Sequence, residues 1–171
     1  MIALNTLFWV LVIVFAFIGF LRGWSKEVLV TFSLILAIFV ITVFLEFIPF
    51  MKPYLEAGGE SRQFIARAVI LMAFAFFGYQ SPKLRRISEA VMRERFQDAV
   101  LGGVVGALNG YFLFGSLLFY LNLYNYPFDW VSAPGGDLLS LLAYMPPAWL
   151  GVPAIYFAVA VAFTFVMVVV I

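Results

Sequence analysis

The chain has 171 residues, of which 65% are hydrophobic and only 11% are charged. An ordinary globular domain is about half apolar and about a quarter charged, and a soluble chain of this length could not bury so much apolar surface. There is no cysteine and no histidine, which excludes disulfides, thiolate-bound zinc, iron–sulfur clusters, imidazole-ligated haem and histidine-activated nucleophiles. We expect a membrane protein without catalytic, cofactor-binding or metal-binding residues, and the net charge of +1 does not suggest a nucleic-acid partner.

Five apolar stretches have the length scale of a membrane span, which needs about 20 residues as a helix. They cover residues 3–20, 28–50, 64–78, 100–123 and 154–171. None shows the alternation of a membrane β-strand, and backbone groups in lipid must pair within their own segment. We predict an all-α, polytopic integral membrane helix bundle with about five transmembrane helices and short interfacial helices. The first stretch lacks a basic start and a small-residue cleavage site, so we expect it to be a retained helix and not a signal peptide.

The distribution of basic residues predicts the orientation. Seven of the ten Lys and Arg residues fall in two alternate connections, at 22–26 and 83–95. The segment 125–153 contains none. The positive-inside rule places the two basic connections in the cytoplasm. The N-terminus is then outside and, with five spans, the C-terminus is inside.

Two connections have the pattern of helices that lie on the membrane surface. Ser81-Pro82 favours a helix start, and apolar and charged residues then separate onto opposite faces through residue 97. This predicts a basic amphipathic helix over 81–97 that binds anionic lipid headgroups; the alternative is a solvated linker helix. On the outer side, we predict a second short helix from Asp137 to Met145, stopped by Pro146-Pro147, within an aromatic belt of Trp130, Tyr144 and Trp149.

The fourth apolar stretch carries a stripe of small residues, Gly102, Gly106 and Gly110. Small residues at this spacing let another helix approach closely. Gly19 and Gly23 repeat the pattern at the inner end of the first stretch. We favour packing within one chain, with a dimer interface or a pore wall as alternatives. Asn109, beside the stripe, could hydrogen-bond across whichever contact forms.

Two charged residues fall at membrane depth. Glu46 lies about one turn before the outer end of the second stretch, and Arg67 lies about one turn into the third. Because both reach a similar depth, we predict an ion pair, which removes the cost of leaving either charge alone in hydrocarbon. One alternative is that the two side chains extend separately to the membrane surface. Another is that they take part in transport.

The inner ends of the first and fourth stretches carry two sequence motifs. The first is a G-x-x-R-G-x-x-K-E pattern made by Gly19, Arg22, Gly23, Lys26 and Glu27. The second starts at Asp98 and continues through the glycine stripe. If the glycine surfaces meet, Arg22 falls about one turn from Asp98, and we predict a contact between these two side chains. The alternative is that Arg22 binds lipid phosphate while Asp98 caps its own helix.

These two motifs, in this order and topology, resemble the colicin V production (CvpA) family over roughly residues 1–125. Ala99 and Asn109 depart from the family pattern, which often has arginine at both positions. The resemblance implies a four-helix CvpA-like membrane core at 1–125. Residues 126–152 then form an outer loop with an interfacial helix, and residues 153–171 form an additional C-terminal transmembrane helix.

The resemblance also implies a bacterial inner-membrane protein associated with colicin V export and envelope integrity. We expect a non-enzymatic protein that supports secretion or the envelope, because no carboxylate cluster and no serine–lysine pair at matching depth is present. The alternatives are an accessory subunit of a larger membrane complex and a small channel or transporter. The expected partners are the lipid bilayer and either further copies of the chain or a larger membrane complex.

Overall fold

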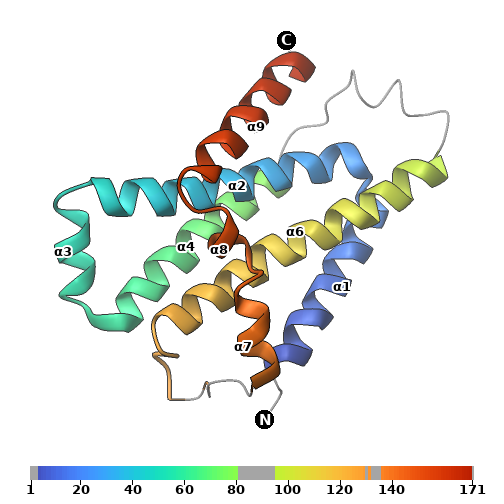
Figure 1. Ribbon diagram of the computed structural model, residues 1–171. Coiled ribbons are helices and arrows are strands. Elements are labelled where there is room, and N and C mark those ends of the chain that lie inside the picture. The colour runs from blue at the N-terminus through green and yellow to red at the C-terminus, as the bar shows by residue number, and fades with distance from the viewer. Residues whose placement is uncertain (1–3, 81–94, 130, 132–135, 171) are drawn as a thin grey trace.

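The computed structural model describes residues 4–80, 95–129, 131 and 136–170, with the backbone alone at 44–46, 95, 136–138, 169 and 170. Every regular element in these ranges is a helix (Figure 1). The prediction of an all-α membrane helix bundle is confirmed. The predicted basic helix over 81–97 falls largely outside the described residues, which resume at residue 95 as part of a longer helix.

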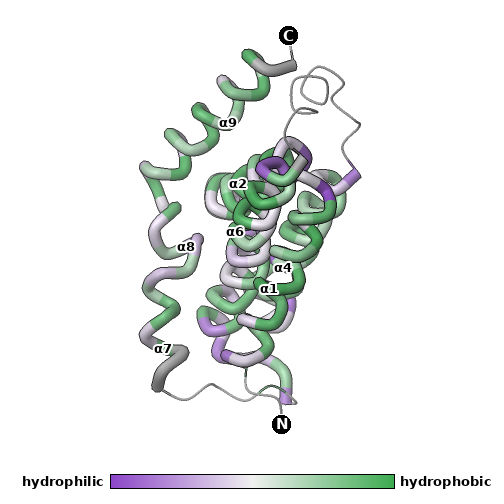
Figure 2. Tube along the Cα trace, turned by 90° about the vertical axis from the view of Figure 1, so that its right-hand side faces the viewer, coloured by the Kyte–Doolittle hydropathy of each residue, from purple (hydrophilic) through white to green (hydrophobic). Residues whose placement is uncertain are grey.

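Four long helices correspond to the first four apolar stretches: α1 (Leu4–Arg22), α2 (Trp24–Phe47), α4 (Gly59–Tyr79) and α6 (Arg95–Leu123). Each contains a segment long and apolar enough to cross a membrane. Three of them, α2, α4 and α6, begin four or five residues before the corresponding apolar stretch. The additional residues are mainly polar, so a search for apolar residues alone does not include this first turn of the helix. Residues are hydrophobic along most of each long helix, and hydrophilic residues gather toward the ends of the bundle (Figure 2). The chain is a multi-pass membrane protein.

The remaining helices are short, apart from the last. α3 (Met51–Glu56) was not predicted and packs against α2 and α4. α7 (Gly136–Leu142) corresponds to the predicted outer helix but begins one residue before it and ends three residues earlier. The two prolines after α7 also begin a helix of their own. Pro146 and Pro147 form the first turn of α8 (Pro146–Trp149), where the fixed φ of proline suits a helix start.

α9 (Ala154–Val170) follows the fifth apolar stretch and has 17 residues. At 1.5 Å per residue it is about 25 Å long, a little shorter than the roughly 30 Å of a bilayer's hydrocarbon core. It packs against α2 through two edge-to-face ring contacts, Phe39–Tyr156 and Phe32–Phe165. Since the numbers rise along α9 as they fall along α2, the two helices are antiparallel.

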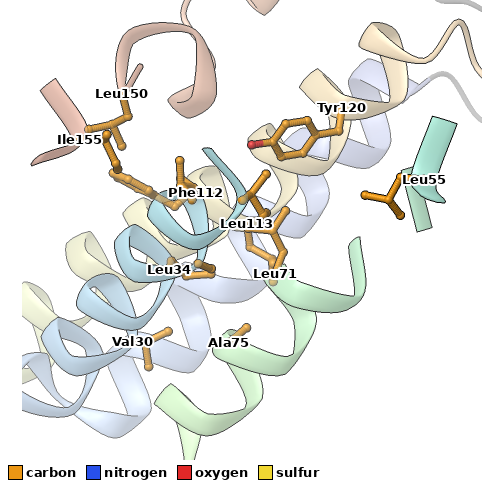
Figure 3. Close-up of a cluster of buried hydrophobic side chains, with 13 residues drawn as sticks. Val30, Leu34, Leu55, Leu71, Ala75, Phe112, Leu113, Tyr120, Leu150 and Ile155 are labelled. Carbon is orange, nitrogen blue, oxygen red and sulfur yellow. The ribbon is translucent and has the colours of Figure 1, made fainter. Parts of the chain in front are cut away.

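α6 contacts each of the other three long helices. α1 runs along one side of it, while α2 and α4 pack on it and on each other (Figures 1 and 2). The main hydrophobic cluster lies between α2, α4 and α6, where Leu34, Leu71 and Leu113 meet (Figure 3). Ile155 of α9 and Leu150 join this cluster. Lipid offers no hydrophobic drive for such packing, so the helices are held by close contact and by polar groups between them.

Candidate functional site: a buried polar network at the basic end of the bundle

The glycine stripe of α6 packs directly against α1. A Cβ atom added at Gly19 would lie 2.7 Å from the Gly106 Cα atom, and one added at Gly106 would lie 2.8 Å from the Gly19 Cα atom. Further along, a Cβ at Gly110 would lie 3.0 Å from the Val12 Cα atom. These separations leave no space for a side chain, so glycine is required for the two backbones to touch. The glycine stripe therefore packs against another helix of the same chain, which is the interpretation that we favoured from the sequence.

The turn between α1 and α2 is a single glycine. Gly23 has φ +85°, in the left-handed region that suits glycine, and its N–H donates to the Gly19 carbonyl at 2.9 Å. A Cβ at Gly102 would lie 2.9 Å from the Gly23 Cα atom. The two sequence motifs thus meet at this turn, as predicted.

Asp98 and Arg22 use other partners than the predicted ones. The Asp98 carboxylate accepts a hydrogen bond from the Trp24 backbone N–H at 3.1 Å, so it caps the start of α2 and not its own helix. Arg22 forms its ion pair with Glu27, at 2.6 Å. Among the described residues no ion pair joins Arg22 to Asp98, and that predicted contact is replaced by this one. The reason is local: Glu27 follows Arg22 by five residues across the Gly23 turn, whereas the Asp98 carboxylate already accepts from the Trp24 N–H.

Glu27 is fully buried, whereas 23% of the Arg22 side chain is exposed. Arg22 also donates to the Tyr79 carbonyl at 3.0 Å, where α4 ends and its last carbonyls lack helical partners. The guanidinium carbon lies 4.4 Å from the centre of the Tyr79 ring, a cation–π distance. One arginine therefore joins the end of α1 to α2 and α4.

Asn109 of α6 completes the surroundings of Glu27. Its amide nitrogen donates to Glu27 Oε2 at 2.8 Å and to the Glu27 backbone carbonyl at 3.0 Å. The Thr31 hydroxyl donates to Asn109 Oδ1 at 2.7 Å, and the Tyr79 hydroxyl lies 3.4 Å from Glu27 Oε2 as a weak donor. Asn109 is itself fully buried. We call Arg22, Glu27, Thr31, Tyr79 and Asn109 the Glu27 network; it links all four long helices at one end of the bundle.

This arrangement satisfies a group that would otherwise be costly. A carboxylate inside a membrane bundle is tolerated when it is paired and hydrogen-bonded. Both oxygens of Glu27 have partners within the chain. The site supplies charge pairing and directed hydrogen bonds that join the four long helices.

Sequence reasoning placed Glu27 in an interfacial turn and so missed its central position. The second apolar stretch of the sequence begins at Val28. The helix α2 itself begins at Trp24, so Glu27 lies inside the helix. The i, i+4 spacing of Glu27 and Thr31, which puts both on one helix face, was the available signal. The suggestion that Asn109 hydrogen-bonds across a helix contact is confirmed. No feature of the sequence indicated that Tyr79 contacts Glu27 and Arg22, because these contacts depend on how α4 packs against α1 and α2.

The predicted ion pair of Glu46 with Arg67 stays a prediction, because the Glu46 side chain lies outside the described residues. The Arg67 guanidinium carbon lies 4.8 Å from the Tyr124 ring centre and 5.9 Å from that of Tyr120. Arg67 also donates to the Gln63 carbonyl at 3.0 Å. Burial raises the pKa of the Tyr124 hydroxyl although Arg67 lowers it, so this tyrosine stays protonated near neutral pH.

Lys26 is the remaining residue of the first motif. It lies in the first turn of α2 and makes no hydrogen bond or ion pair with any described residue. Its side chain is partly exposed. The structure thus brings Arg22, Glu27 and Asn109 together and leaves Lys26 apart from them.

The family model for the colicin V production protein matches residues 4–133. This chain belongs to the colicin V production protein family. The resemblance drawn from the two motifs is confirmed, and the matched region contains α1 to α6 with all five residues of the Glu27 network. Comparison with curated proteins and with solved structures finds no match. Asn109, which the sequence motifs single out as a departure from the resemblance, donates to Glu27 without adding a charge.

Proposed function

We propose that this chain is a non-enzymatic inner-membrane protein of the colicin V production type, which supports secretion or envelope integrity. The observation that carries this proposal is the Glu27 network, in a chain of that family. A buried carboxylate and amide whose partners all lie within the chain suit a rigid membrane scaffold. A path for ions or substrates needs polar groups that are free to bind what passes.

The cavities support the same proposal over a channel or transporter. Two cavities in the described part of the chain, of about 260 and 310 Å³, are lined almost wholly by apolar side chains. The Glu27 network lines neither of them. Apolar cavities of this kind suit hydrocarbon and do not replace the hydration of an ion.

We further propose five spans, with the N-terminus outside and the C-terminus in the cytoplasm. Two contacts support this orientation. The hydrogen bonds of Trp24 with Asp98 and of Arg22 with the Tyr79 carbonyl bring the ends of both basic connections to one end of the bundle, which the positive-inside rule assigns to the cytoplasm. The antiparallel packing of α9 on α2 directs the end of α9 toward that same side.

The proposal is tested by deleting the gene in its own bacterium. We expect the deletion to increase sensitivity to bile salts and large antibiotics or to reduce export of a colicin, and the wild-type gene to restore both. Purified protein in sealed liposomes should show no ion flux above protein-free liposomes. A deletion strain without any envelope or export defect would contradict the proposal, and flux that Asn109→Leu abolishes would favour a channel.

A further inference from the structure

A groove of about 260 Å³ lies between α2, α4 and α9. Its walls include Leu29, Ser33 and Leu36 of α2, Gly78 of α4, and Ala162 and Phe163 of α9. α9 lies on the outside of the four-helix bundle, beside α2 (Figure 2). Gly78 has no side chain and lets α4 approach α2 closely: a Cβ atom added there would lie 3.0 Å from the Val30 Cα atom. The groove is therefore built from three membrane helices and not from a loop.

The chemistry of the walls suits a hydrocarbon chain. Among the described residues that line the groove, only Ser33 has a polar side chain, and its hydroxyl donates to the Phe74 carbonyl at 2.5 Å. The groove thus offers an occupant no free donor from its side chains. Since α2 and α4 span a membrane, the molecules that reach this face are lipids, whose acyl chains match the apolar walls.

The groove lies in the half of the bundle next to the basic end. Its lining residues on α2, from Leu29 to Leu36, belong to the first half of that helix, and Gly78 belongs to the last turn of α4. A chain lying in it would belong to a lipid of the leaflet at this end. The headgroup of that lipid would lie near the first turn of α2.

Lys26 is placed to bind such a headgroup. Lys26, Leu29, Ser33 and Leu36 are spaced i, i+3, i+7 and i+10, so they share one face of α2. Helical side chains project toward the helix N-terminus, so Lys26 extends from the groove toward the membrane surface. Its ammonium has no partner among the described residues, whereas the neighbouring Arg22 is held by Glu27. A cation that no described residue pairs with, at the rim of an apolar groove, complements an anionic phosphate.

We propose that this groove binds one anionic phospholipid, with an acyl chain against α2, α4 and α9 and its phosphate at Lys26. The proposal requires only that these helices span a bilayer, and it is independent of any role in secretion. The lipid would fill the space between α9 and the bundle and so fix α9 in place.

The test is native mass spectrometry of the purified protein with phosphatidylglycerol or phosphatidylcholine carrying the same acyl chains. We expect one phosphatidylglycerol to be retained about fivefold more strongly than phosphatidylcholine, as one lysine near a phosphate allows. Ala162→Leu fills the groove and should remove retention of both lipids, whereas Ala160→Leu, on the exposed side of α9, should not. Lys26→Gln should remove the preference for phosphatidylglycerol, whereas Lys52→Gln in α3 should keep it.

A second measurement on the wild-type protein does not depend on how the variants fold. Phosphatidylglycerol with a photoreactive group on its acyl chain should form adducts within 29–36 and 159–166. Adducts confined to other helix faces would overturn the proposal. So would equal lipid retention by the Ala162 and Ala160 variants, an unchanged headgroup preference in Lys26→Gln, or a dimer that replaces the lipid and is lost in Ala162→Leu.

Discussion

The amide of Asn109 on α6 donates to the carboxylate of Glu27 on α2 at 2.8 Å, and both side chains are fully buried. This hydrogen bond joins the two helices that contribute most to the core of the bundle. It also satisfies one oxygen of the Glu27 carboxylate without adding a charge. Arg22 supplies the positive charge that balances the Glu27 carboxylate. Asn109 therefore needs only to donate a hydrogen bond to it.

The first prediction follows from this contact. Asn109→Leu keeps the branched shape of the side chain but leaves Glu27 Oε2 with only the weak donor Tyr79, so the free energy of unfolding should fall by about 1–3 kcal/mol. Leu101→Ala, on an exposed face of the same helix, is the control and should cost less. SDS titration in mixed micelles measures both values, and an Asn109→Leu variant as stable as the wild type would contradict the role assigned to the network.

The second prediction concerns the ion pair of Arg22 with Glu27. Removing either charge alone leaves the other partly or wholly buried without its partner, so Arg22→Met and Glu27→Gln should each destabilise the protein. Because Arg22 is partly exposed, we expect each cost to lie below the roughly 3–5 kcal/mol of a fully buried pair. The double variant should lose less than the sum, with a coupling of about 0.5–3 kcal/mol.

The control for this cycle combines Glu27→Gln with Arg62→Met. Arg62 lies at the opposite end of α4 and donates to the Tyr54 carbonyl. These two changes share no partner, so their costs should add. Equal coupling in both cycles would show that the measured energy does not come from the ion pair.

The helices themselves could be predicted from the sequence, and their polar contacts largely could not. Apolar stretches of span length determine the positions of α1, α2, α4 and α6, because lipid permits few other structures. The contact of Gly19 with Gly106 was predictable because small residues at matching depth leave few other pairings. The partner of Arg22 was not predictable in the same way, since Glu27 and Asp98 both lie within one turn of it. The conformation of Gly23 and the position of Tyr79 determine that Arg22 pairs with Glu27 and not with Asp98, and neither could be predicted from the sequence.

The third prediction tests the glycine contact between α1 and α6. Gly106→Leu introduces a side chain where even a Cβ atom would lie 2.8 Å from the Gly19 Cα atom, so the helices must separate. We expect aggregation or a melting temperature well below that of the wild type. Leu108→Phe enlarges a side chain that is 40% exposed and should change little. Similar size-exclusion profiles and melting temperatures for the two variants would contradict close packing at this stripe.

The fourth prediction retains the pairing of Glu46 with Arg67. If the two form an ion pair, Glu46→Gln and Arg67→Met should each destabilise the protein more than the double variant does. The contacts of Arg67 with Tyr120 and Tyr124 give an internal control, since Arg67→Met loses them whatever residue stands at 46. Strictly additive costs would assign Arg67 to these rings alone.

The fifth prediction is the topology. The chain has no cysteine, so single cysteines report their own accessibility without background. Ser61 lies near the start of α4, and its hydroxyl donates to the Pro127 carbonyl at 3.1 Å, which puts both at the end opposite the Glu27 network. Ser61→Cys should react with a membrane-impermeant maleimide in intact cells, as should Ser132→Cys. Ser88→Cys, in the basic connection, should react only after the membrane is opened.

A fluorescent protein fused after residue 171 tests the fifth span. It folds in the cytoplasm and should fluoresce if α9 crosses the membrane, because five spans return the chain to the inner side. A periplasmic alkaline phosphatase fused at the same point should then be inactive. Active phosphatase together with external labelling at Ser61 would mean that α9 lies on the outer surface, as its length of about 25 Å against a core of roughly 30 Å allows. Labelling of Ser88→Cys in intact cells would invert the whole arrangement.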